Sequence, residues 1–162
     1  MQRSKSSIRS FNSISSSSWS FSNSSISLKS LVLETRDTHH VCCSLSSFTF
    51  LIPTANLFIA LPNGYSIPIK CIGSVQLRDN LLLSKVLYVP DFHFNLISIS
   101  VLTKNHQFSV NFLIDSCIIQ DHTQGKVIGM GRRQDNLYVF YSSSSPKFLD
   151  ILTNCNKVSI TK

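Results

Sequence analysis

The chain has 162 residues, of which 43% are hydrophobic and 14% charged, and its formal net charge is +7 at pH 7. A soluble domain usually has about 25% charged residues, so this composition indicates a chain that hides surface, either in a homodimer or inside a larger polyprotein. The lysines and arginines are scattered, and no basic helix, zinc finger or RNP-like aromatic strand accompanies them. Specific nucleic-acid binding is therefore not expected.

Residues 1–27 are rich in serine, and no acidic residue precedes Glu34. Such low complexity without sustained periodicity predicts a disordered leader. An acid-free start containing Arg and Ser is also typical of organelle transit peptides, so a transit peptide and a plain leader on a cytoplasmic protein both stay open. No membrane partner is expected, because the longest apolar stretch, 48–61, falls short of the roughly 20 residues that a transmembrane helix needs.

Residues 28–141 are predicted to form one domain of short strands separated by turns. The segments with strand-like patterns are 31–33, 69–77, 81–89, 108–113, 117–120, 126–130 and 137–141. Asn95 is expected to cap a short helix over about 96–104. Short strands at this spacing with one short helix predict an all-β fold, a small closed or partly closed β-barrel. Residues 142–162 are predicted to be a linker.

One hairpin is expected around Pro62, Asn63 and Gly64. Asn-Gly between apolar flanks is the strongest short hairpin signal, because both residues tolerate a positive φ. Pro62 and Pro68 confine the arms of this hairpin to sheet edges, where a missing N–H breaks no ladder. In the next strand, Gly73 predicts a bulge or a close approach of two backbones.

The five cysteines lack the even, regular spacing of a secreted disulfide framework, so a reducing, cytoplasmic location is expected. Cysteine and histidine gather in the segment His39-His40-Val41-Cys42-Cys43. Zinc sites use separated pairs such as Cys-x-x-Cys, whereas adjacent residues of a strand point to opposite faces. This segment is interpreted as strand and turn residues, and neither a metal nor a cofactor is expected.

Three short motifs follow one another along the chain: Glu34-Thr35-Arg36-Asp37-Thr38-His39-His40, Leu61-Pro62-Asn63-Gly64, and Asn95-Leu96-Ile97-Ser98 after a Tyr-Val-Pro. In this order they resemble the aspartic protease of copia-type retrotransposon Pol polyproteins, over about residues 31–140. The family carries Asp-Ser/Thr-Gly-Ala-Thr/Ser-x-His at the first motif.

The resemblance implies a retropepsin-like β-barrel that acts as a homodimer and hydrolyses peptide bonds of its own polyprotein. It also implies that the hairpin at Pro62, Asn63 and Gly64 serves as a flap over the substrate. Ile128-Gly129 is similar to the hydrophobic-Gly element in the second half of retropepsins, and 142–162 to the start of the pre-integrase segment.

At the catalytic loop this chain departs from the family pattern. Glu34 stands at the position of the catalytic Asp and Arg36 at that of the Gly, while Thr35 is retained and Asp37 replaces the Ala. The added methylene of Glu34 displaces its carboxylate, and such misplacement can cost about 10²-fold in rate. A cation at position 36 holds nearby carboxylates ionised, whereas a catalytic dyad needs a shared proton. The loop Glu34, Thr35 and Arg36 is thus predicted to be the family's catalytic loop in a non-functional form.

Two alternatives stay open. Asp37-Thr38 is itself an Asp-Thr pair and could serve as the catalytic loop with the register shifted by three residues, although His39 would then stand at the Gly position. The chain could also be a non-enzymatic β-barrel, retained as a binding or dimerisation module.

Overall fold

The computed structural model describes residues 7–8, 31–35, 37–61, 63–78, 81–104, 107–134 and 136–140. The first strands in chain order are β1 (Ser7–Ile8), β2 (Leu31–Glu34), β3 (Val41–Cys42), β4 (Phe48–Pro53), β5 (Phe58–Ala60) and β6 (Ser66–Pro68). They are followed by β7 (Cys71–Arg78), β8 (Leu81–Tyr88), β9 (Asn95–Ser98), β10 (Phe108–Phe112), β11 (Ser116–Asp121), β12 (Lys126–Gln134) and β13 (Leu137–Phe140). One α-helix, α1 (Ile99–Thr103), follows β9, and one 3-10 turn spans Leu45–Ser47.

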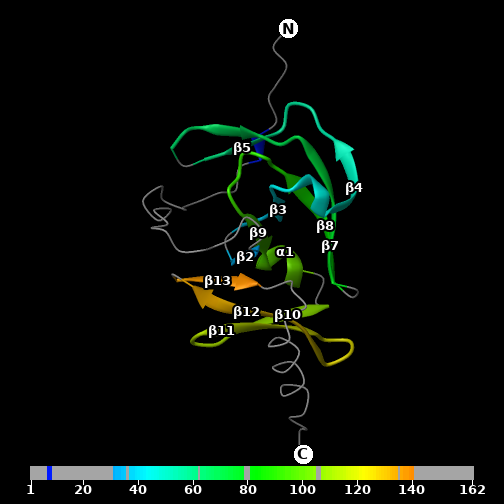
Figure 1. The fold of residues 1–162 in the computed structure, drawn as a ribbon, viewed down its shortest axis with the longest axis vertical. Helices are drawn as coiled ribbons and strands as arrows, with labels where there is room; N and C mark the ends of the chain where they lie inside the picture. Colours follow the sequence, from blue (N-terminus) through cyan, green and yellow to red (C-terminus); the bar gives the residue numbers. More distant parts are fainter. Residues whose placement is uncertain are drawn as a thin grey trace, which may run out of the picture.

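Ten of the strands form one curved sheet in the order β10-β11-β12-β13-β2-β9-β3-β8-β7-β4, and β1-β5-β6 form a small second sheet. In the described residues, β10 and β4 do not pair with each other, so the barrel is partly closed. Figure 1 shows β10 to β13 at one end of the molecule and β5 with β4 at the other, while α1 lies between. The predicted all-β fold with a partly closed barrel and one short helix is confirmed.

The centre of the large sheet is the parallel pair β2–β9. Leu31 lies opposite Asn95 and Leu33 opposite Ile97 in this pair. Strands buried on both faces are continuous apolar runs rather than alternating ones, and this is how β2 is built. Its residues alternate between two apolar clusters, with Leu31, Leu33 and Ile97 in one cluster and Val32 with Leu96 in the other. The end of β2 is thus fixed by packing from both sides.

The Asn-Gly hairpin is present as β5–β6, with Ile59 opposite Ile67. Its turn is longer than two residues, because the N–H of Leu61 bonds to the carbonyl of Tyr65 at 2.8 Å. Gly64 takes a φ of 85°, which a glycine adopts without strain. Pro68 lies in β6, an edge strand of the small sheet, as expected for a residue without an N–H.

Gly73 lies at a register shift between β7 and β8, and a Cβ on this residue would come within 2.0 Å of the carbonyl oxygen of Phe50 on β4. Both expectations for this glycine, the bulge and the close backbone approach, are therefore met. No strand was expected over Phe48–Pro53, but these residues form β4, which pairs with β7 at the sheet edge.

The predicted capping role of Asn95 is wrong. Asn95 opens strand β9, and the helix begins four residues later with Ser98 as its N-cap. The cause is tertiary, because Leu96 and Ile97 are drawn into parallel pairing with β2 and so adopt the extended conformation. Ile128-Gly129, which resembles the family's hydrophobic-Gly element, lies in β12, and β13 separates that strand from β2.

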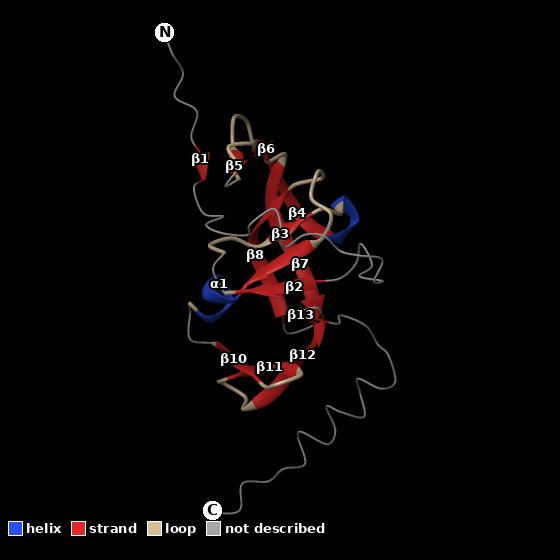
Figure 2. Ribbon diagram, turned by 90° about the vertical axis from the view of Figure 1, so that its left-hand side faces the viewer, coloured by secondary structure: helices blue, strands red, loops and turns tan. Residues whose placement is uncertain are grey.

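Of the predicted leader (1–27) and the predicted linker (142–162), the structure describes only two residues. Ser7–Ile8, within the predicted leader, forms β1 and pairs with β5 in parallel (Figure 2). The rest of the leader and residues 141–162 lie outside the described residues, so the boundaries at 27 and 141 stay predictions.

Candidate active-site loop

The loop predicted to be catalytic begins where β2 ends. Glu34 is the last residue of β2 and lies opposite Ser98 of β9 in the parallel register. Thr35 is exposed in the bend that follows, and the chain returns through His40 into β3. Arg36 and the side chain of Glu34 lie outside the described residues. β2 and β9 are parallel and end side by side. The segment that follows β9 therefore lies next to the loop that follows β2.

Ser98 ties the loop to the start of α1. Its hydroxyl donates a hydrogen bond to the backbone carbonyl of Asp37 and accepts one from the N–H of Val101 at 3.2 Å. The hydroxyl of Ser100 donates to the same Asp37 carbonyl at 2.8 Å. Ser98 is fully buried, so its own two bonds are made away from water and their loss would leave buried groups unsatisfied. The loop is held through its main chain.

His40 provides a second anchor. The backbone N–H of Ser98 donates to Nδ1 of His40 at 3.0 Å, which requires that this nitrogen carries no proton. His40 is 3% exposed. Burial, with a smaller contribution from the neighbouring His39, lowers the pKa of His40 from 6.5 to about 4. The ring is therefore neutral at pH 7, with its proton on Nε2.

The return of the loop into β3 is fixed on both sides. The N–H of Leu87 in β8 donates to the His40 carbonyl at 2.9 Å, and the N–H of Cys43 donates to Oδ1 of Asn95 at 2.9 Å. Val41 is buried opposite Leu87 in the short parallel pair β3–β8. The loop thus joins three elements that are far apart in the sequence.

Asp37 lies inside the protein with 2% exposure, while Thr38 after it is exposed. The hydroxyl of Thr38 bonds with Nδ1 of His39 at 2.8 Å. An Asp-Thr pair acting in a shifted register would need the Asp37 carboxylate to reach a water and a substrate. Its burial in the described chain does not favour this alternative.

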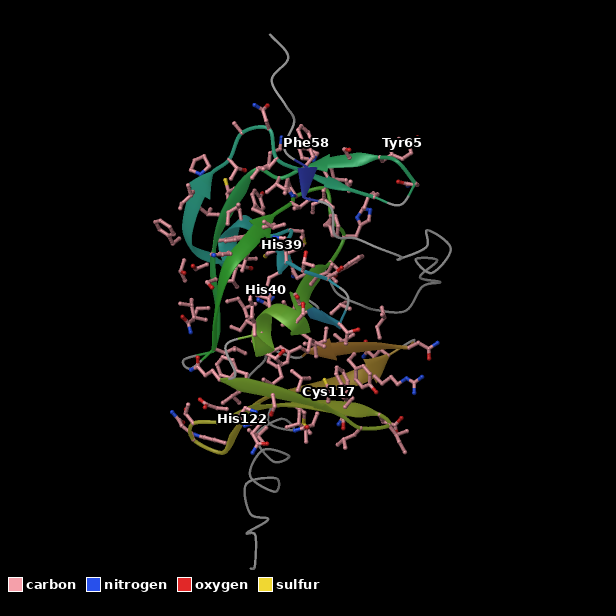
Figure 3. The ribbon with its side chains drawn as sticks, turned by 180° about the vertical axis from the view of Figure 1, so that it is seen from behind. His39, His40, Phe58, Tyr65, Cys117 and His122 are labelled. Atoms are coloured by element: carbon pink, nitrogen blue, oxygen red, sulfur yellow. The ribbon has the colours of Figure 1, made fainter. Side chains whose placement is uncertain are left out.

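The flap-like hairpin lies away from the loop. Oδ1 of Asn63 accepts from the N–H of Tyr65 at 3.1 Å, and Tyr65 is exposed, whereas Pro62 lies outside the described residues. Figure 3 shows Tyr65 at the outer end of the hairpin and His39 and His40 nearer the middle of the molecule. The structure therefore does not bring Asn63 and Gly64 against the loop that begins at Glu34.

No group of His, Cys, Asp and Glu that could hold a metal ion occurs among the described residues. Cys42, Cys43, Cys71 and Cys117 are free thiols. Burial raises the pKa of Cys117 to about 11 and also raises the pKa of Cys42, so these two thiols are protonated at neutral pH. No helix in the described part of the chain has the length and apolar character of a membrane span.

Sequence reasoning missed the two serines that support the loop. Ser98 entered only as part of the Asn-Leu-Ile-Ser motif, and Ser100 was not singled out. The available signal was the Ser-x-Ser spacing directly after an apolar strand and at the start of a helix, where serine commonly caps. The pairing of that strand with β2 could not be read from local sequence.

Comparisons with known proteins find matches among retrotransposon Pol polyproteins. Residues 31–107 match the family described as the Pol polyprotein β-barrel domain. The chain is 31% identical over 141 residues, 85% of its length, to the "Retrovirus-related Pol polyprotein from transposon RE2" of Arabidopsis thaliana. It is 31% identical over 118 residues, 70% of its length, to the corresponding polyprotein from transposon RE1.

The chain spans only about a tenth of these relatives, 10% of the first and 8% of the second. No solved structure shows a significant match to it.

Proposed function

Because residues 31–107 match the family described as the Pol polyprotein β-barrel domain, we propose that this chain carries the aspartic-protease region of a copia-type element, with a catalytic loop that no longer supports cleavage. The ancestral activity is hydrolysis of peptide bonds in the element's own polyprotein by a homodimer. The observation that carries the proposal is the position of Glu34-Thr35 at the end of the doubly buried strand β2, beside β9.

The chemistry of an aspartic dyad explains why this position matters. Two carboxylates from two chains share one proton, because like charges at close range cannot both be ionised. One carboxylate takes a proton from a water, and the protonated partner polarises the scissile carbonyl. A rigid central strand that ends at the loop can hold each carboxylate in place.

The substitutions act on this dyad and leave its scaffold in place. Glu34 has a longer side chain than the family's Asp, and Arg36 adds a cation where a glycine lets two loops approach. One described support of the loop is made to its main chain and not to a side chain. Ser98 and Ser100 bind the backbone carbonyl of Asp37, which an alanine at that position would present equally well.

The proposal is tested by restoring the loop in the full chain. The variant Glu34→Asp, Arg36→Gly, Asp37→Ala is compared with the natural chain for cleavage of a peptide library between acid and neutral pH. The matched control has Glu34→Asn with the other two changes, so that only the carboxylate is missing. We expect cleavage by the restored chain alone, blocked by an active-site inhibitor of aspartic proteases.

Two results would contradict the proposal. Cleavage by the natural chain that is sensitive to the inhibitor would show that the loop is functional as it stands. The restored chain could also fail to cleave although it keeps the unfolding temperature of the natural chain. That result would show that the changes in the loop are not the cause of inactivity, and the protease assignment would fail.

A second candidate function, a non-enzymatic binding or dimerisation module, has its own support. Phe50 and Ile52 on the edge strand β4 are 60% and 55% exposed. Large apolar side chains on an unpaired edge are typical of a strand that meets another chain. This candidate predicts association without cleavage, and the surface that it uses differs from the loop.

A further inference from the structure

One outer strand of the small sheet, β1, comes from a part of the chain about 50 residues before the other two strands. β5 is the middle strand, with β6 antiparallel on one side and β1 parallel on the other. Ser7 lies opposite Phe58 and Ile8 opposite Ile59. Figure 2 shows β1 as a separate short strand beside β5 and β6, above the large sheet.

The side of β5 that faces β1 would be an open edge without it. An edge strand presents unpaired N–H and C=O groups, which pair readily with any extended chain. β5 is held in place by packing, because Ile59 is fully buried in the apolar cluster that also contains Ile69 and Leu96. If β1 leaves, this fixed strand is a preformed acceptor for another extended peptide.

The pairing that fills this edge is short. Two residue pairs join β1 to β5, whereas three join β5 to β6 and five join β4 to β7.

We infer that the edge of β5 opposite β6 is a docking site for an extended peptide, and that the chain's own segment at Ser7–Ile8 occupies it as an internal ligand. Recognition is by the main chain of Phe58–Ala60, so the partner is defined by its extended conformation more than by its side chains. The inference does not depend on cleavage and goes beyond the proposed function.

The first arm of the test is hydrogen exchange in the full chain. Ile8→Pro fixes φ at this residue near −65°, away from the value of about −120° typical of a parallel strand, so it weakens the pairing without changing β5. The control is Ile14→Pro, which places the same residue elsewhere in the Ser-rich region. We expect faster amide exchange over Phe58–Ala60 in the first variant only, with exchange over Leu31–Glu34 unchanged in both.

The second arm adds a fluorescent peptide with the sequence of residues 4–11. In the natural chain it must compete with a tethered segment at an effective concentration of order millimolar, so binding should be at least about tenfold tighter to the Ile8→Pro chain. The control peptide carries proline in place of Ile8 and should not bind.

Unchanged exchange over Phe58–Ala60 in the Ile8→Pro chain would overturn the inference. So would a peptide that binds neither chain, or one that binds both chains with equal affinity.

Discussion

The imidazole of His40 makes the folded chain sensitive to acid. Its pKa is lowered to about 4, against an ordinary value of 6.5 in the unfolded chain. Below pH 6.5 the unfolded chain binds a proton that the folded chain does not, so stability is present above that pH and is lost as the pH falls toward 4. The difference of about 2.5 pH units corresponds to roughly 3 kcal/mol of unfolding free energy.

The variant His40→Asn tests whether His40 causes this loss of stability at acid pH. The Asn oxygen can accept from the N–H of Ser98 and does not titrate, so the variant should lose less stability than the natural chain between pH 7 and pH 4. Urea unfolding at several pH values measures the difference. His93→Asn, at an exposed position, serves as the control. If the natural chain and His40→Asn lose equal stability over this range, His40 is not the cause.

Gly73 has no room for a side chain. A Cβ there would lie 2.0 Å from the carbonyl oxygen of Phe50, and backbone must move to admit it. We expect Gly73→Ala to lower the unfolding free energy by about 1–3 kcal/mol. The matched control is Gly125→Asn, since Gly125 has a φ of 61° that asparagine tolerates and open space around its Cβ. Thermal unfolding measures the stability of both variants. Equal stability would show that β4 can shift to admit the new side chain without cost.

At the scale of elements, the junction of β2, β9 and α1 depends on one hydroxyl. Ser98→Ala removes the N-cap of α1 and one of the two bonds to the Asp37 carbonyl. The loss of a cap and of a buried partner together is expected to cost about 1–3 kcal/mol. Ser100→Ala removes only the second bond to that carbonyl and should cost less than Ser98→Ala.

Chemical denaturation gives both values, and amide exchange over residues 37–40 should rise most in Ser98→Ala. A larger effect from Ser100→Ala would show that the exposed serine, rather than the buried one, holds the loop.

The elements that the sequence predicted are those with local signals. The runs at β2, β8, β11 and β12, the hairpin β5–β6 and the bulge at Gly73 all follow from patterns within a few residues. The strand β4 and the extended conformation of Asn95-Leu96 escaped prediction, because long-range pairing produces them. Val41 pairs with Leu87, and β2 pairs with β9 some sixty residues later. The loop position was predictable from its motif, whereas its supports at Ser98 and Ser100 required that pairing.

At the scale of the whole molecule, the partly closed sheet leaves two edges, β4 and β10. The protease proposal predicts a dimer joined near the loop, while the binding-module alternative predicts one joined through β4. The double change Phe50→Ser, Ile52→Ser separates them, with light scattering after size exclusion as the measurement. We expect the dimer to survive this change. Its loss, with the fold intact by circular dichroism, would favour the alternative.

The central claim is that the fold of a dimeric aspartic protease persists and that its loop alone has failed. The most direct test is the specific activity of the chain restored at positions 34, 36 and 37, measured over a wide range of protein concentration. Because each chain supplies half of the dyad, we predict activity per chain that rises with concentration and then levels off, and none in the matched chain with asparagine at position 34. Activity that does not depend on concentration, or no activity in a folded restored chain, would contradict the account.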